Sequence, residues 1–305
     1  MKTTNFMKLG MMMMAAMAIS FTSCKKDKTD AEPDSGSLQQ LSKDQVTVES
    51  ASDDALNDAN DVISSTAKIL PCNVTNVVDT LNDTITHTLT FSGLNCAGTR
   101  IREGVVKVKR YISTPWSQAG TVVTVNFINL KVTKVSTGNW VILNGVKFWT
   151  NVSGGVIANL GTTATAIVHK ISGVLDATFN DNTTRSWNIA RQKTYTGTYP
   201  NDIVRSVDGF GSANGYNQLE AWGINRHGEQ FYTQILQTVV MRKACDWDAS
   251  AGIVKHQIPS DNKSATITFG FDSSNQPITG TNCPYEYKVD WVKNTHSGTL
   301  YIVLP

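Results

Sequence analysis

The sequence predicts an all-β fold: one antiparallel meander that forms a large sandwich, roll or curved sheet. From Val74 onward, stretches of alternating polarity, or stretches rich in Val, Ile, Thr and aromatic residues, are separated by Gly, Asn and Asp. This pattern is typical of half-buried strands joined by tight turns. No helical pattern interrupts it, which disfavours a βαβ arrangement. No second linker divides residues 71–305, so we expect a single domain there.

The clearest strands are expected at residues 84–91, 104–112, 121–135, 164–171, 185–196, 218–224, 230–241, 265–271, 285–293 and 299–304. One hairpin is predicted in detail, because Asn144-Gly145 is a preferred pair for a two-residue type I′ turn. Its apolar face should lie in the core: Val141, Leu143, Val146 and Phe148.

The other face of this hairpin places Trp140 directly opposite Trp149. Trp222 also lies in phase with polar residues of its own strand. These three tryptophans form a candidate binding surface, because exposed aromatic rings can stack on sugars or anchor a protein partner. Packing under a second sheet or a loop is the alternative.

The N-terminus is typical of a signal peptide over residues 1–23. A basic start is followed by an apolar stretch that is too short to span a bilayer, which takes about 20 apolar residues as a helix. The small residues before Cys24 resemble the bacterial lipobox, with Phe21 where leucine is usual. The resemblance implies that the Cys24 thiol carries diacylglycerol and anchors the mature chain to a membrane. An ordinary signal peptide with a chance cysteine is the alternative.

Residues 24–70 are expected to form a flexible, acidic tether. Of the 25 acidic residues, 10 lie within residues 27–61, which leaves residues 62–305 with 21 basic against 15 acidic residues, a net charge of +6. A segment this poor in apolar side chains cannot bury enough surface to order itself. Within it, a serine followed by two acidic residues predicts a short helix over residues 53–67.

The remaining four cysteines predict two disulfides, as an even number does in an exported chain: Cys72, Cys96, Cys245 and Cys283. An internal repeat favours one pairing, because residues 88–96, TLTFSGLNC, are echoed by TITFG at 266–270 and TNC at 281–283. Two similar units most simply close in the same way, which gives Cys72–Cys96 and Cys245–Cys283. A zinc site is the alternative, but the close Cys-x-x-Cys spacing is missing.

This layout resembles a set of uncharacterised Bacteroidota lipoproteins, which share a Cys…Thr-x-Thr-x-Phe-Gly…Cys unit near each end of the domain. The resemblance covers most of residues 72–305 and implies a framework and a location, the outer membrane, but no reaction. Whether the domain faces outward or into the periplasm stays open. Two tripeptides, Asp-Thr-Leu and Asp-Thr-Ile, look like the O-glycosylation acceptor of exported Bacteroidota proteins, which makes Thr80 and Thr84 candidate glycosylation sites.

The sequence contains no recognisable catalytic or metal-binding pattern, and we expect neither a metal nor a cofactor. The five histidines are scattered, never at metal-ligand spacing. Residues 209–215, GFGSANG, lack the spacing of a serine nucleophile elbow and of a dinucleotide fingerprint, so a turn is expected there. Glycosidase chemistry needs two facing carboxylates, for which the candidates are Glu103, Glu220, Glu229 and Glu286. The weak, dispersed positive charge argues against binding of nucleic acid.

These observations favour a non-catalytic β-domain, held at the cell envelope by lipid, that binds a glycan, a matrix component or a protein partner. One alternative is an envelope hydrolase that acts on glycan or peptide through a site assembled from distant strands. Another is a carrier of hydrophobic ligands, which would need an apolar groove.

Overall fold

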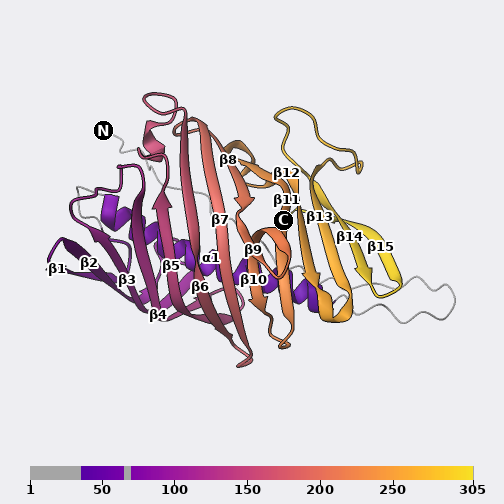
Figure 1. Ribbon diagram of the computed structural model, residues 1–305, viewed down its shortest axis with the longest axis horizontal. Helices are drawn as coiled ribbons and strands as arrows, with labels where there is room; N and C mark the ends of the chain where they lie inside the picture. Colours follow the sequence, from indigo (N-terminus) through magenta and orange to yellow (C-terminus); the bar gives the residue numbers. More distant parts are fainter. Residues whose placement is uncertain (1–35, 65–69, 305) are drawn as a thin grey trace, which may run out of the picture.

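The computed structural model describes residues 36–64 and 70–304 and confirms the all-β prediction. In this part of the chain, fifteen strands form one antiparallel sheet, and one long helix lies across one of its faces (Figure 1). We call this face the helix side of the sheet and the opposite face the outer side. The predicted signal peptide and Cys24 lie outside the described residues.

The elements are, in chain order, α1 (Gly36–Ser64), β1 (Val74–Leu81), β2 (Thr84–Leu94), β3 (Arg100–Tyr111), β4 (Thr121–Lys134), β5 (Trp140–Asn151), η1 (Ile157–Asn159), β6 (Ala166–Phe179), β7 (Thr184–Thr198), β8 (Asp202–Gly209), β9 (Gly211–Ala213), β10 (Tyr216–Ile224), β11 (Gln230–Arg242), η2 (Lys243–Cys245), β12 (Ala249–Ile258), η3 (Pro259–Asp261), β13 (Lys263–Phe271), β14 (Glu286–Lys293) and β15 (His296–Val303).

Strands that follow one another in the chain are neighbours in the sheet from β1 to β7 and from β10 to β15. The order changes at β7. Its N-terminal part, from Ser186 to Ile189, pairs with β10, and its C-terminal part, from Arg191 to Thr198, pairs with β8. β8 also pairs with the C-terminal part of β11. β8 and β10 therefore lie end to end in one position of the sheet.

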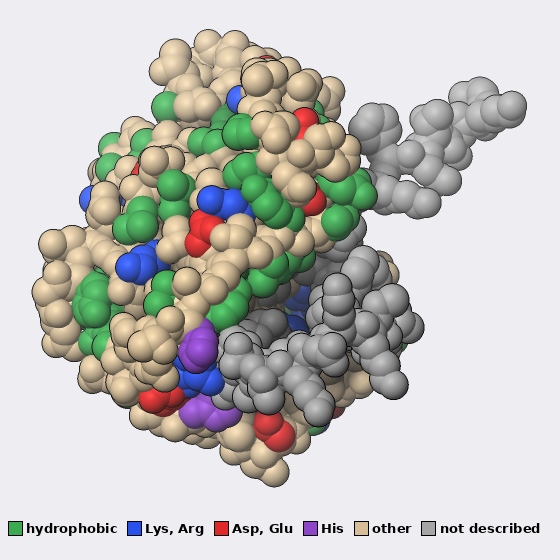
Figure 2. All heavy atoms as spheres, turned by 90° about the vertical axis from the view of Figure 1, so that its right-hand side faces the viewer, with side chains coloured by type: hydrophobic (Ala, Val, Ile, Leu, Met, Phe, Trp, Pro, Cys, Tyr) green, Lys and Arg blue, Asp and Glu red, His purple; other side chains and the backbone are tan. Residues whose placement is uncertain are grey.

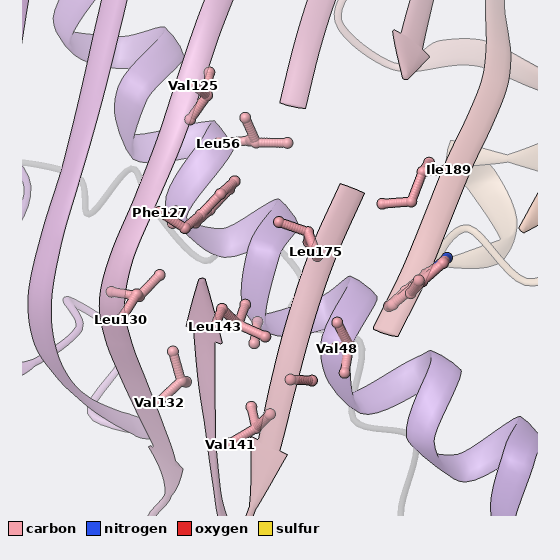
Figure 3. Close-up of a cluster of buried hydrophobic side chains, with 14 of the residues drawn as sticks. Val48, Leu56, Val125, Phe127, Leu130, Val132, Val141, Leu143, Leu175 and Ile189 are labelled. Carbon is pink, nitrogen blue, oxygen red and sulfur yellow. The ribbon is translucent and has the colours of Figure 1, made fainter. Parts of the chain in front are cut away.

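The hydrophobic core lies between α1 and the helix side of the sheet. Val48 and Leu56 of the helix belong to one buried cluster with Phe127, Leu143 and Leu175 of the strands (Figure 3). Complete burial of an aliphatic or phenylalanine side chain contributes roughly 1.5–3 kcal/mol to stability. The helix is therefore part of the domain and covers the apolar face that the sheet could not leave in water.

The prediction of a flexible tether over residues 24–70, with a short helix at residues 53–67, is wrong in its extent. α1 already begins at Gly36 and packs on the sheet, and residues 65–67 lie outside the described part of the chain. The prediction rests on the small number of apolar side chains in this segment and leaves ion pairs out of account. In the structure Asp44 and Glu49 pair with arginines of the sheet, so the acidic segment orders itself against the basic β-domain.

The predicted hairpin at Asn144-Gly145 is also wrong, because β5 runs straight through both residues. Gly145 pairs with Phe127 on one side and Leu175 on the other. A Cβ atom on Gly145 would lie within 3.0 Å of the carbonyl oxygen of Val174, so this glycine permits a close approach of two strands. An Asn-Gly pair with two positive φ angles, 49° and 82°, does occur between β9 and β10, at residues 214–215.

Because there is no hairpin, the prediction that four apolar residues of this segment share one buried face is only half right. Val141 and Leu143 are in the core as predicted, but Phe148 is 45% exposed on the outer side. Lys147 lies in the core instead of its predicted neighbours Val146 and Phe148, and only 2% of its surface is exposed.

Both predicted disulfides are present. Cys72 and Cys96 have Cα atoms 5.0 Å apart, and Cys245 and Cys283 have Cα atoms 5.3 Å apart. The first joins the segment before β1 to the turn between β2 and β3, and the second joins η2 to the connection between β13 and β14. Each disulfide therefore links two connecting segments, one near each end of the sheet.

Candidate functional site

The three tryptophans of the predicted binding surface lie apart. Trp140 and Trp149 are on the same strand at an odd spacing, so strand alternation turns them to opposite sides of the sheet. Trp149 is on the helix side, with its ring centroid 4.7 Å from that of Trp116. Trp140 is on the outer side, with Lys131 Nζ 5.2 Å from its ring. Trp222 lies on β10, three sheet positions from β5. Only Trp149 belongs to the cluster described below.

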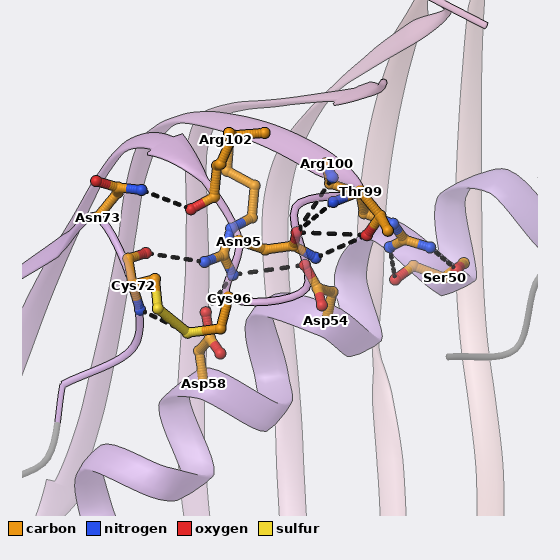
Figure 4. Close-up of polar contacts among 11 residues, drawn as sticks. Ser50, Asp54, Asp58, Cys72, Asn73, Asn95, Cys96, Thr99, Arg100 and Arg102 are labelled. Atoms are coloured by element: carbon orange, nitrogen blue, oxygen red, sulfur yellow. Dashed lines mark hydrogen bonds and ion pairs between the residues drawn. A yellow bond between two sulfur atoms is a disulfide. The ribbon is translucent and has the colours of Figure 1, made fainter. Parts of the chain in front are cut away.

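Ion pairs fasten α1 to the helix side of the sheet. At one end, Arg102 of β3 lies 3.4 Å from Asp54 and also contacts Asp58 (Figure 4). Its Nη2 donates to the carbonyl oxygen of Cys72 at 3.3 Å. The side chain of Arg102 is only 2% exposed. A buried arginine with these partners holds the helix and the first disulfide at one point.

Midway along the helix, Arg191 of β7 holds two carboxylates. It contacts Glu49 of α1, and its Nε lies 2.9 Å from Glu220 Oε2 of β10. Burial raises the pKa of Glu220. For Arg191, burial lowers the pKa of the guanidinium, but the charges of Glu49 and Glu220 outweigh it and the pKa is raised. The two carboxylates are thus bound to one buried cation, not placed across an open cleft.

A polar relay continues from Glu220 to β12. Gln45 of α1 donates to Glu220 Oε1 at 3.0 Å, and Thr233 Oγ1 donates to Gln45 Oε1 at 3.2 Å. Thr233 Oγ1 also lies 2.9 Å from His256 Nδ1. Burial, followed by the charge of Arg185, lowers the pKa of His256 to about 4. This histidine is therefore neutral at pH 7.

Asp53 of α1 lies among four basic residues of the helix side. Lys193 Nζ is 3.4 Å from Asp53 Oδ2, and the side chains are 13% and 38% exposed, so solvent reaches this pair. Partial burial raises the pKa of Asp53, but the charges of Lys193, Lys147, Arg191 and Arg205 outweigh it and hold the pKa well below its usual value. Positive charge therefore dominates around this carboxylate.

Arg205 differs from Arg191 and Lys193, which pair with carboxylates, and from Lys147, which donates to the hydroxyl of Ser52. Among the described residues, no carboxylate forms an ion pair with it. It lies opposite Tyr195 in the pairing of β7 with β8. Its guanidinium is 5.0 Å from the ring of Trp247, and its Nη2 donates to the thioether sulfur of Met241 at 2.8 Å. Its buried Nε has no hydrogen-bond partner in the described part of the chain. Arg205 is thus a cation whose charge is not neutralised by a partner.

Aromatic rings lie beside these cations. His169 is directly opposite Lys193 in the pairing of β6 with β7. Its ring centroid is 5.2 Å from Trp116, 5.5 Å from Trp149 and 5.7 Å from Tyr195. The buried Nε2 of His169 and Nε1 of Trp149 have no hydrogen-bond partner among the described residues. Burial, followed by the charge of Lys193, lowers the pKa of His169 to about 4.

We define the helix-side cluster as Asp53, Trp149, His169, Lys193, Tyr195 and Arg205. Its two cations outnumber its one carboxylate, and the buried Nε1–H of Trp149 has no partner among the described residues, which is uncommon in proteins. Such a set suits an oxyanion, which accepts charge-assisted hydrogen bonds from Arg and Lys. The rings of Trp149 and Tyr195 add flat apolar surface beside it.

One pair in this region has the composition of a catalytic dyad. Lys147 Nζ donates to Ser52 Oγ at 2.7 Å, and burial lowers the pKa of Lys147 to about 8. Serine activated by lysine is a known nucleophile pair. However, Ser52 is 0% exposed and Lys147 is 2% exposed. A substrate cannot reach this hydroxyl, so the pair ties α1 to β5.

The other residues predicted from sequence fall outside the helix-side cluster. The candidate glutamates are not brought together: Glu103 is near Lys131 on the surface, Glu229 is near Lys263, and Glu286 is buried on β14. Thr80 is exposed and Thr84 is half-buried, on either side of the turn between β1 and β2.

Sequence reasoning missed the helix-side cluster, although the sequence carried a signal for it. Arg185, Arg191 and Lys193 share the phase of Trp187 and Ile189 on β7. A core-facing phase that contains three cations needs acidic partners from another segment, and the segment before the sheet is the acidic part of this chain.

Searches against protein-family models, curated proteins and solved structures find no match for this chain. Within residues 36–64 and 70–304, no helix combines the length and the apolar character needed to cross a membrane.

Proposed function

We propose that this chain is a lipid-anchored protein of the cell envelope whose β-domain is a non-catalytic binding module for an acidic glycan. The anchor is the lipid on Cys24, and the location is the outer membrane. The ligand binds at the helix-side cluster, at the solvent-reachable end formed by Lys193, Tyr195 and Arg205.

The observation that supports this proposal is the surplus of cations and unpartnered N–H donors beside aromatic rings. A carboxylate, sulfate or phosphate group on a sugar would accept hydrogen bonds from Arg205 and Lys193. The face of Tyr195 would contact the apolar face of the sugar ring. Burial of Ser52 and Lys147 removes that pair as a catalytic candidate, and α1 fills the apolar space that a hydrophobic-ligand carrier would need.

The test is a glycan array probed with the mature chain, using pairs of glycans that share a backbone and differ only in a carboxylate, sulfate or phosphate group. We expect binding to the acidic member of a pair. Arg205→Gln should weaken that binding roughly tenfold or more, because a hydrogen bond to a charged group contributes about 1.5–3 kcal/mol.

Lys170→Gln is the matched control. Lys170 lies on β6 near Phe210 on the outer side, so this variant removes the same charge away from the site and should bind as the wild type does. Equal binding to acidic and neutral glycans, or equal loss in both variants, would contradict the proposed site. Thermal unfolding of each variant checks that the fold is intact.

A further inference from the structure

The β14–β15 hairpin at the C-terminal end of the sheet is apolar on the helix side, beyond the start of α1. Tyr287, Val289 and Trp291 of β14 alternate on this side. Leu300 pairs with Val289 and Ile302 with Tyr287, so the five side chains form one continuous apolar surface. Leu300 is 39% exposed, and the other four are partly exposed, Val289 being packed on one side against the core cluster. We call this surface the hairpin face.

The hairpin continues this apolar character to its free edge. β15 is the last strand of the sheet, and Tyr301 and Val303, on its other side, are 38% and 44% exposed. Between Ser297 and Val303 the strand has no charged residue. Figure 2, which looks at the molecule from this end, shows patches of hydrophobic side chains with few charges between them. Exposed apolar patches of this kind mark surfaces that meet a partner or a membrane.

The helix start lies near the hairpin. Gln45, in the N-terminal half of α1, bonds to residues of β10 and β11, whereas Asp58, near the C-terminus, contacts β3. α1 also contacts β12 and β13, and Figure 1 shows its first turns behind this part of the sheet. The chain therefore enters the fold at the end of the sheet that carries the hairpin.

The distance to the proposed lipid is short. Gly36 follows Cys24 by 12 positions in the sequence, and a fully extended chain spans at most about 3.6 Å per residue, so the anchor lies within roughly 43 Å of the helix start. A short tether gives a high effective concentration of the membrane around the nearest surface. Even a surface with a weak affinity for lipid would then be bound to the membrane for much of the time.

We propose that the hairpin face docks on the lipid surface to which the chain is anchored. Tryptophan and tyrosine are the side chains enriched at membrane interfaces, because the ring is apolar and the polar tip stays wet. Lys293, which shares the side of Tyr287, Val289 and Trp291 on β14, can extend toward phosphate groups. The contact is interfacial and does not span the bilayer, because the free backbone groups of β15 need water or headgroups as partners. This inference rests on the proposed anchor but names a different surface from the glycan site.

The test compares amide hydrogen exchange of β15 in solution and on vesicles of phosphatidylethanolamine and phosphatidylglycerol. The mature chain is held by a hexahistidine tag before Lys25 on a nickel-chelating lipid, which replaces the natural anchor at the same place. We expect exchange in β15 to slow roughly tenfold on the vesicles, and Leu300→Glu/Ile302→Glu to abolish this change.

β1, at the opposite end of the sheet, is the matched control. Val77 and Val78 are 65% and 50% exposed, and Val77→Glu/Val78→Glu should leave the slowing in β15 unchanged. Unaltered exchange of β15 on vesicles would overturn the inference. Slowing that appears without vesicles and grows with protein concentration would also overturn it, in favour of pairing between two copies through β15.

The intact mass of the chain purified from membranes separates this inference from the proposed function. A mass without diacylglycerol would remove the natural anchor, and with it the proposed function. The exchange experiment does not depend on that result, because the tag supplies the tether.

Discussion

Arg102 shows the energetic role of a single buried charge in this fold. Its guanidinium is held by Asp54 and Asp58, and it lies 4.8 Å from the ring of Phe91. Loss of one partner of a buried ion pair is costly, because the other charge stays desolvated and unpaired. Arg102→Met takes this buried cation away from Asp54 and Asp58 and should lower the free energy of unfolding by about 3–5 kcal/mol, measured by urea denaturation.

The control for this prediction also neutralises the partners. Arg102→Met/Asp54→Asn/Asp58→Asn removes both carboxylate charges as well, so it should recover a large part of the loss. A triple variant no more stable than Arg102→Met would show that packing of the arginine stem, not its charge, holds this end of the helix.

His256 makes stability depend on pH. Its pKa is lowered to about 4 in the folded protein, against about 6.5 in the unfolded chain. Below pH 6.5 the unfolded chain therefore binds a proton that the folded protein does not, and stability falls as the pH decreases toward 4. From pH 7 to pH 5 this residue alone should cost about 2 kcal/mol.

Urea denaturation of wild type and His256→Gln at both pH values measures this contribution. The variant cannot take up that proton, so its stability should fall by about 2 kcal/mol less over the same interval. Identical losses in the two proteins would show that His256 is not held neutral by burial.

At the scale of the element, Gly145 allows β5 to approach β6 closely in the centre of the sheet. Its φ is 127°, and a Cβ atom would collide with the backbone of Val174. Gly145→Ala should therefore destabilise the protein both by backbone strain and by forcing β5 away from β6. Gly120 has a φ of 81° but open space around its Cα, so Gly120→Ala isolates the strain, about 1–2 kcal/mol.

Comparison of the two variants separates the steric collision with β6 from the backbone strain. Gly145→Ala should lower the midpoint of thermal unfolding clearly more than Gly120→Ala. Equal effects would mean that β5 and β6 can separate locally without loss, which is the behaviour of a loop such as the sequence predicted at Asn144-Gly145.

These elements also show how far sequence reasoning extends. Alternation and turn residues were enough for the fold class, because an antiparallel sheet with one buried face repeats every second residue. The same local signals could not place Asn144-Gly145, since an Asn-Gly pair also suits a strand interior where two backbones approach closely. The internal repeat gave both disulfide pairings, because it compares two distant parts of the chain.

The helix-side cluster needed information of another kind. Lys193, Tyr195 and Arg205 come together with Asp53 only because α1 crosses the strands, and no local pattern gives the path of a helix across a sheet. The opposite charges of residues 27–61 and 62–305 were visible in the sequence. The segment is poor in apolar side chains, which predicts a flexible tether, but ion pairs with a basic surface of the same chain add to its few apolar contacts.

At the scale of the whole molecule, α1 and the sheet should form one cooperative unit. Leu41, Val48 and Ala55 of the helix are at most 1% exposed, and their cluster extends across strands from both halves of the sheet. Without α1, this apolar face and the cations Arg102, Arg185 and Arg191 would be open to water. A chain that begins at Leu70 should therefore show no cooperative thermal unfolding and should bind a hydrophobic dye in buffer.

A chain that begins at Gly36 is the matched control, because it removes residues 1–35 and retains the whole helix. It should unfold in one transition, followed equally by far-ultraviolet circular dichroism and tryptophan fluorescence. If the chain from Leu70 unfolds cooperatively at the same temperature, α1 is an accessory strap, and the helix side of the sheet is stable when uncovered. That result would restore the hydrophobic-ligand carrier as the better interpretation, because the apolar face would then be free to take a ligand in place of the helix.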